Sequence, residues 1–144
     1  MNNPNCSKCY ASLRLFGDNI VPDDISKLLG VIPNYKVVKG KEVISPSGKQ
    51  RIAPTGCWIL NSEQNKSTDL DEHINWLLDQ VSRTEYPVAL RHIVGVEKMD
   101  IFCYWSSATG QGGPEFLVET LCRLSSMGLK LGLDIYFCEI HEKE

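Results

Sequence analysis

A glycine-rich stretch, SSATGQGGPEF at residues 106–116, is the part of the sequence that comes nearest to an anion-binding site. It lies between an apolar strand-like run and an expected helix, and backbone amides at such a helix entry can hold an anion. However, neither the lysine of a Walker loop nor the G-x-G-x-x-G fingerprint of a dinucleotide site is present. Pro114 removes one backbone amide, and the carboxylate of Glu115 would repel a phosphate. The glycines are therefore interpreted as a strand-to-helix joint that uses positive φ angles.

Cysteine is the second residue type that could carry a chemical function, as a metal ligand or a redox group. Of the six cysteines, Cys6 and Cys9 form a C-x-x-C motif, which can be half of a zinc site or a redox pair. A structural zinc needs four ligands, and neither a second C-x-x-C nor a closely spaced histidine pair supplies the others. A thioredoxin-type pair would open a helix after a strand, whereas this one lies in a polar tail. We therefore expect no metal site and no cofactor.

Aromatic side chains suggest a recognition surface. Tyr104 and Trp105 are neighbours in an expected strand, so their rings point to opposite faces of the sheet and one of them lies away from the helices. Exposed aromatic rings are common anchors for a protein partner. A sheet that binds RNA carries basic residues beside its rings, whereas the strand MDIFCYWSS has an acid and no base. The candidate binding residues are Trp58, Tyr104, Trp105, Ser106, Ser107, Gln111 and Tyr136.

Charged residues within the expected strands have a structural interpretation. A partly buried charge needs a partner, and an Arg–Asp pair across adjacent strands supplies one. The residues available for such a pair are Arg14, Arg91, Asp100 and Asp134. His92 has the chemistry of a general base, yet no nucleophile or carboxylate is tied to it by local spacing. We therefore assign no catalytic residue and expect no enzymatic activity.

Size and charge limit the class of protein. The chain has 144 residues, of which 42% are hydrophobic and 23% are charged, and this suits one globular domain with its own core. The formal net charge of −3 disfavours a nucleic-acid partner, because lysine and arginine contacts to phosphate dominate that binding. No apolar run is long enough to span a membrane, and the N-terminus lacks the pattern of a secretory signal. These features predict a cytoplasmic protein that binds neither nucleic acid nor membrane.

The elements that must position these residues follow from hydrophobic periodicity. In the first half of the chain, alternation predicts a strand over residues 10–17, and Pro22 and Gly30 bracket a short helix. Residues 35–45 and 51–60 are expected to form two strands joined by a turn.

The second half of the chain contains two expected helices and three expected strands. Thr68 and Asp71 have the spacing of a capping box at the start of a helix over residues 67–82. The next helix is expected over residues 113–128, with Pro114 at its first position. Its buried stripe is expected to consist of Leu117, Leu121 and Leu124. The strands are expected over residues 88–96, 99–107 and 129–140.

The predicted fold is α+β, with elements in the order βαββαββαβ. Hairpins outnumber parallel crossovers, so we expect a mostly antiparallel sheet with about three helices on one face and ferredoxin-like elements in the second half. The other face of the sheet is left to long side chains, a partner or water. Residues 10–140 are expected to form a single domain, between a polar tail over residues 1–9 and a C-terminal tail over residues 141–144.

Four segments of the chain carry a resemblance to a known family. They are LRLFGDNIVPDDISKLLGVIP, TGCWILNSE, DLDEHINWLLDQV and GGPEFLVETLCRLSSMGLKLGLDIYFCE. In their order and spacing, residues 10–139 resemble a family of small bacterial and phage proteins designated domain of unknown function 4279. The resemblance implies no reaction, cofactor or catalytic residue, and it implies that some relatives are immunity-like neighbours of toxin genes.

Together these observations predict a non-enzymatic protein-interaction domain. An immunity or inhibitor protein that acts on a toxin or defence protein is the specific form that we expect. The alternative is a small-ligand or nucleotide-binding domain, with enzymatic activity included, that uses residues 106–115. A further expectation is a homodimer through an unpaired edge of the sheet.

Overall fold

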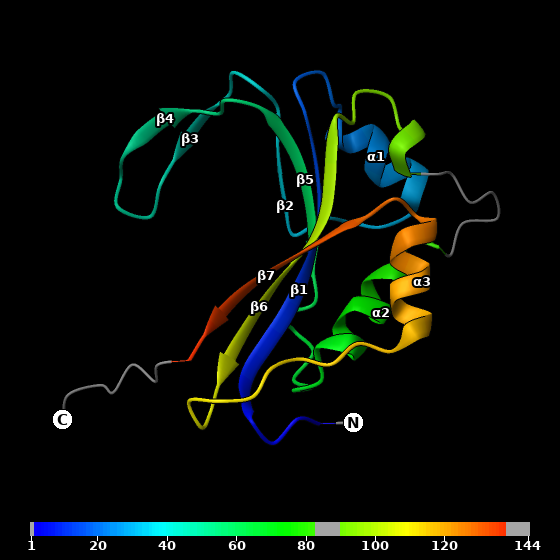
Figure 1. Ribbon diagram of the computed structural model, residues 1–144. Helices are drawn as coiled ribbons and strands as arrows, with labels where there is room; N and C mark the ends of the chain where they lie inside the picture. Colours follow the sequence, from blue (N-terminus) through cyan, green and yellow to red (C-terminus); the bar gives the residue numbers. More distant parts are fainter. Residues whose placement is uncertain (1, 83–89, 138–144) are drawn as a thin grey trace.

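A computed structural model describes residues 2–82 and 90–137 and contains a five-stranded sheet with helices on one side (Figure 1). The strands lie in the order β2-β5-β1-β6-β7. Their bounds are β1 (Cys6–Gly17), β2 (Tyr35–Val37), β5 (Gly56–Asn61), β6 (Lys98–Ser107) and β7 (Lys130–Tyr136). Neighbouring strands are antiparallel except β6 and β7, which are parallel and joined by a helical crossover. The expected α+β class with a mostly antiparallel sheet is confirmed.

The central strand β1 begins earlier than the sequence predicted. Residues 6–9, which we assigned to a polar tail, belong to β1 and pair with β6. The side chains of Cys6 and Cys9 are both buried. Extending the strand through them removes two apolar side chains from water, which the hydrophobic effect favours.

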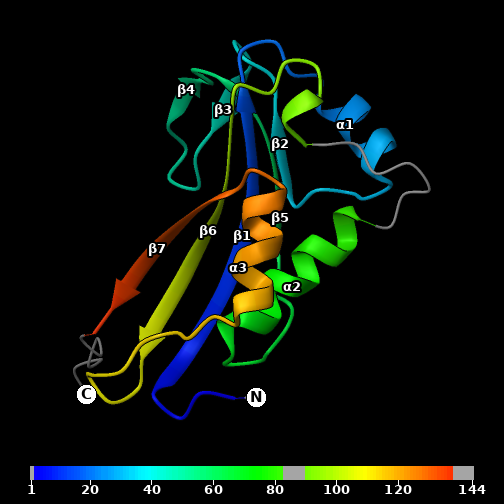
Figure 2. The ribbon, with the colours of Figure 1, turned by 45° about the vertical axis from the view of Figure 1, so that its right-hand side comes forward.

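Three helices cover one face of the sheet (Figures 1 and 2). Their bounds are α1 (Pro22–Leu29), α2 (Leu70–Val81) and α3 (Val118–Ser126). Alternate side chains of the central strands point towards these helices and are buried against them. The core on this face includes Leu13, Leu15, Ile25, Leu60, Ile74, Leu77, Leu78, Ile101, Trp105 and Leu124.

The first helix has the boundaries that its flanking residues predict, whereas α2 begins at Leu70, later than the expected residue 67, and has a different cap. Gly30 adopts the left-handed conformation (φ 69°) that ends α1. At the start of α2, Asp69 rather than Thr68 is the cap, because its Oδ1 accepts a hydrogen bond from the backbone N–H of Asp71 at 3.0 Å. Thr68 Oγ1 instead accepts from the backbone N–H of Asn3.

The third helix begins later than expected, at Val118, so Pro114 is not its first residue. Of the predicted apolar stripe, Leu124 is buried, whereas Leu117 and Leu121 are exposed. The prediction was wrong because the contact between α3 and α2 is largely polar. Thr120 faces α2, where its Oγ1 accepts a hydrogen bond from Asn75 Nδ2 at 2.8 Å.

The two strands expected over residues 35–45 and 51–60 are each divided. Gly40 adopts φ 86°, a turn conformation that suits glycine. Pro54 has no N–H to donate to a ladder. The outer halves form a separate two-stranded ribbon, β3 (Glu42–Ile44) and β4 (Gln50–Ile52), which stands apart from the helices (Figure 1). A second small core anchors this ribbon and consists of Val37, Ala53 and Cys57 with the partly buried Phe16, Val43 and Ile59.

A strand was predicted over residues 88–96, but the described residues 90–96 do not form one. Residues 90–92 form a 3-10 helix, and residues 88 and 89 lie outside the described residues. Leu90 and Ile93 are both buried in the main core, and a helical turn places both side chains on one side. The last strand begins near the predicted point, while its predicted end and the predicted C-terminal tail lie outside the described residues. Within residues 2–82 and 90–137, no helix has the length and apolar character needed to cross a membrane.

Candidate functional site

Two of the predicted binding residues lie in the core. Trp58 and Trp105 are fully buried, and Trp58 Nε1 donates a hydrogen bond to Ser26 Oγ on α1 at 3.1 Å. Their positions on the inner face bring them against the helices, so neither ring reaches the surface. The neighbouring Tyr104 points to the opposite, uncovered face, as the alternation within the strand predicted.

The glycine-rich loop that follows β6 uses its polar groups within the protein. Ser107 is buried, and its Oγ accepts from the backbone N–H of Thr109 (3.2 Å) and Gln111 (3.0 Å) while donating to the Gln111 carbonyl. Ser106 is partly exposed on the uncovered face of the sheet, and its backbone carbonyl accepts from Ser7 Oγ. The hydroxyl group of Ser107 therefore holds the loop in shape. The helix α3 begins after the loop, at Val118.

The N-terminal residues Asn3 and Asn5 form hydrogen bonds with the same loop, and nothing in the sequence indicated this contact. Asn5 Oδ1 accepts a hydrogen bond from Thr109 Oγ1 at 3.0 Å, and Asn3 Nδ2 donates to the Gly113 carbonyl. A Cβ atom on Gly112 would lie 2.7 Å from Cβ of Asn5, so the close contact requires glycine. A hollow of about 680 Å³ lies between these residues and the start of α2.

Three tyrosine rings form a row across the uncovered face of the sheet. Tyr10 on β1 and Tyr104 on β6 are direct cross-strand partners, and their ring centroids lie 5.2 Å apart with nearly parallel planes. Tyr136 on β7 continues the row, with its centroid 5.2 Å from that of Tyr104. We call these three residues the tyrosine row. Tyr104 and Tyr136 were among the predicted binding residues, whereas Tyr10 was not, although the alternation of β1 places it on the face opposite the buried leucines.

A partly buried ion pair lies on the same face of the sheet as the tyrosine row, farther along β1 and β6. Arg14 donates two hydrogen bonds to the Asp100 carboxylate, from Nε at 2.8 Å and from Nη2 at 2.6 Å. Its guanidinium also lies over the ring of Phe102, with Cζ 4.3 Å from the centroid. The hydrogen bonds to Asp100 raise the pKa of Arg14 above its usual value. The Arg–Asp pair predicted across adjacent strands is confirmed.

Two further polar contacts involve side chains at the ends of the tyrosine row. Lys8 Nζ lies 3.1 Å from a carboxylate oxygen of Glu63 and 5.7 Å from the ring centroid of Tyr10. The phenol of Tyr136 donates to Asp134 Oδ2 at 2.8 Å, and this hydrogen bond raises the pKa of Tyr136. Burial raises the pKa of Tyr10 as well. The higher pKa favours the neutral phenol at Tyr10 and Tyr136, which present apolar rings with hydroxyl tips.

A serine–histidine contact in the core has the atoms of a catalytic dyad but lacks access. Ser62 Oγ lies 2.7 Å from His73 Nδ1, and both residues are buried. His73 Nε2 lies 2.7 Å from the Ser67 carbonyl, which can only accept, so Nε2 carries a proton. Ser62 Oγ also accepts from the backbone N–H of Ala11. The contact therefore fixes α2 to the sheet and offers no open nucleophile.

Four of the five cysteines in the described chain are buried free thiols, and Cys122 is an exposed one. Cys6, Cys9, Cys57 and Cys103 are buried, and burial raises the pKa of each thiol. For Cys103 the pKa rises to about 12. In residues 2–82 and 90–137 we find no group of three or more metal-ligating side chains that could hold a metal ion.

The fold and these contacts define an α+β domain with one face covered by helices and one face carrying the tyrosine row. Residues 7–138 match the family described as Domain of unknown function (DUF4279), and the chain belongs to this family. The resemblance stated from the sequence segments is thereby confirmed. Searches among curated proteins and among solved structures gave no match.

Proposed function

We propose that this domain binds another protein through the uncovered face of its sheet. The observation that carries the proposal is the tyrosine row, which spans three adjacent strands on the face that the helices leave open. Tyrosine rings provide large contact areas at a low cost in conformational entropy, and they are enriched among residues that dominate protein interfaces.

The charges on this face favour a protein over a nucleic acid. Lys8 and Arg14 on this face are paired with carboxylates, which makes them less available to phosphate. The exposed Lys98 and Lys130 lie on the same face at the other end of β6 and β7 from the tyrosine row. Asp134 adds another acid next to Tyr136. A net charge of −3 also assists association with a basic partner by electrostatic steering.

The partner class that we propose is a cytoplasmic toxin or defence protein that this domain inhibits, without catalysis by the domain itself. The five free thiols of the described chain suit a reducing compartment. The alternative function, small-ligand or nucleotide binding by residues 106–115, has weaker support. The hydroxyls of Ser107 and Thr109 in that segment already form hydrogen bonds within the protein.

Affinity capture from the native host, with quantitative mass spectrometry, tests the proposal. Tyr104→Ser removes the ring at the centre of the tyrosine row and is expected to reduce recovery of a bound protein by about tenfold or more. The purified partner should then lose its toxic or defensive activity when the unaltered domain is added.

Tyr35→Ser is the matched control. Tyr35 matches Tyr136 of the tyrosine row in exposure (44% and 45%), so Tyr136→Ser is measured beside Tyr104→Ser. Tyr35 lies on the same face of the sheet but on β2, at the opposite edge. We expect the control to retain the partner. A partner that is recovered equally with Tyr104→Ser and Tyr35→Ser binds elsewhere on the domain, and this result would contradict the proposal.

A further inference from the structure

The strand β7 leaves one edge of the sheet open. It pairs with β6 on one side, and within the described residues no strand pairs with its other side. The opposite edge strand, β2, is only three residues long, whereas β7 has seven. A long edge strand offers a row of unpaired N–H and C=O groups to another chain.

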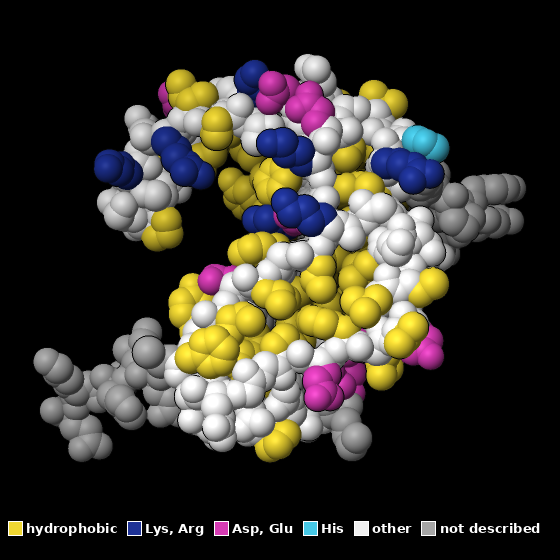
Figure 3. All heavy atoms as spheres, viewed as in Figure 1, with side chains coloured by type: hydrophobic (Ala, Val, Ile, Leu, Met, Phe, Trp, Pro, Cys, Tyr) yellow, Lys and Arg dark blue, Asp and Glu magenta, His cyan; other side chains and the backbone are white. Residues whose placement is uncertain are grey.

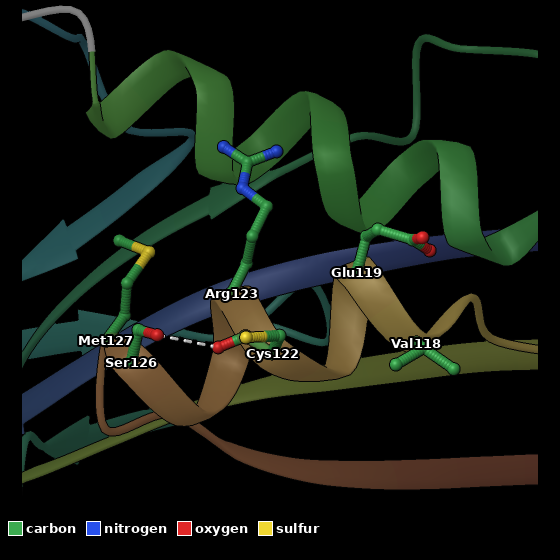
Figure 4. A pocket seen from close by; sticks show the side chains of 6 residues that line it. All are labelled: Val118, Glu119, Cys122, Arg123, Ser126 and Met127. Carbon is green, nitrogen blue, oxygen red and sulfur yellow. Dashed lines mark hydrogen bonds between the residues drawn. The ribbon is translucent and has the colours of Figure 1, made fainter.

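Apolar side chains flank this edge. Leu133 and Phe137 are 41% and 47% exposed, and Val118 on the neighbouring helix α3 is 77% exposed. In Figure 3 the hydrophobic side chains gather over β7 and α3. A shallow hollow of about 470 Å³ runs along α3, where Val118 and Cys122 point away from α2 while Arg123 points towards it (Figure 4). An exposed apolar surface of this kind, beside an open strand, marks an interaction site.

The sequence of β7 is complementary to itself when two copies run antiparallel. If the two-fold axis passes through Gly132, Lys130 of each copy lies opposite Asp134 of the other, and Leu131 lies opposite Leu133. Both charges lie on the uncovered face of the sheet, and both leucines lie on the helical face. A shift by one residue would place leucine opposite aspartate, and a shift by two would separate the opposite charges.

We propose that the protein forms a two-fold symmetric dimer in which β7 pairs antiparallel with β7 of a second copy about Gly132. Two such copies join their five-stranded sheets into one continuous sheet. Opposite charges at directly paired positions stabilise the antiparallel contact, and the paired leucines bury apolar surface beside them. The outer faces of the two α3 helices then approach each other across the axis.

This inference goes beyond the proposed partner surface, because it uses the strand edge and α3 rather than the uncovered face. In the dimer the two tyrosine rows lie on the same face of the joined sheet. The second copy therefore extends the proposed partner surface without covering Tyr104.

Sedimentation velocity of the full chain over a range of concentrations tests the dimer. Asp134→Lys places Lys130 opposite a lysine in both symmetric pairs and is expected to raise the dissociation constant of the dimer by about tenfold or more. Lys130→Asp is expected to have a similar effect. The double variant Lys130→Asp with Asp134→Lys restores opposite charges at both pairs and is expected to restore the dimer.

Lys49→Asp is the control for Lys130→Asp, because it makes the same charge change on the exposed turn between β3 and β4. Circular dichroism verifies that each variant remains folded. A monomeric unaltered chain, a dimer insensitive to both single variants, or a double variant that stays monomeric would each overturn the proposal. Tyr104→Ser is expected to remain dimeric, so failure of the dimer can be distinguished from failure of the partner surface.

Discussion

Several side chains of the uncovered face are held by contacts with their neighbours. Arg14 is held by two hydrogen bonds to Asp100 and by the ring of Phe102, and Tyr104 lies between the stacked ring of Tyr10 and the tilted ring of Tyr136. Ordered rings lose little conformational freedom on binding. At the residue scale, contacts within the domain therefore hold the side chains of the proposed partner surface.

The thiol of Cys103 predicts how stability depends on alkaline pH. An unfolded thiol ionises near its ordinary pKa of 9.0, whereas burial raises the pKa of folded Cys103 to about 12. The folded state holds the proton more tightly, so this contribution is fully present below pH 9 and is lost as pH rises through the folded pKa. Replacing the thiol removes up to about 1.4 kcal/mol of that loss per pH unit.

Urea unfolding at a series of alkaline pH values measures this effect in Cys103→Ala. The variant is expected to lose stability less steeply with pH than the unaltered chain, although its stability at neutral pH is lower because a buried sulfur is missing. Cys122→Ala changes an exposed thiol and serves as the control. A Cys103→Ala profile parallel to that of the unaltered chain would show that Cys103 is not the group responsible.

The helices α2 and α3 are joined by a buried carboxylate. Asp71 Oδ1 accepts the backbone N–H of Leu117 at 2.9 Å, and its Oδ2 accepts from Asn75 Nδ2 at 3.0 Å. The entry of α3 carries no side-chain cap of its own, so α2 supplies a hydrogen-bond acceptor there. This contact positions α3 beside the edge strand β7.

Removing this carboxylate is expected to destabilise the fold. Asp71→Ala leaves a backbone N–H and an amide without their acceptor and should lower the free energy of unfolding by about 1–3 kcal/mol. Asp79→Ala removes an exposed carboxylate from its pair with Arg123 on the same two helices and should cost less than about 1 kcal/mol. Chemical denaturation measures the free energy of unfolding of both variants. Equal losses would show that the buried carboxylate of Asp71 stabilises the fold no more than the exposed ion pair does.

For the whole molecule, the sequence predicted which side chains share a face of a strand better than it predicted which face is buried under the helices. Alternation correctly placed Tyr104 and Trp105 on opposite faces, and the Arg–Asp pair expected across adjacent strands is present as Arg14 with Asp100. It does not say which face the helices cover, because that depends on contacts between distant segments. Trp58 was therefore assigned to a binding surface although it is buried.

The two separate cores predict that the molecule opens in parts. Cys57 belongs to the small cluster beneath the ribbon β3–β4, whereas Cys103 lies in the main core beneath the helices. A small cluster buries little apolar area, so its local opening costs less free energy than opening the main core. With a thiol reagent under native conditions, Cys57 is expected to be modified faster than Cys103.

Mass spectrometry of peptides follows this modification site by site, and the exposed Cys122 reports the rate without opening. Val43→Ser weakens the contact of β3 with the small cluster, so it should accelerate modification of Cys57 and leave Cys103 unchanged. Equal acceleration at Cys57 and Cys103 would mean that the ribbon and the main sheet open as one cooperative unit. Selective acceleration would instead mean that the ribbon and its small core open while the sheet that carries the tyrosine row stays intact.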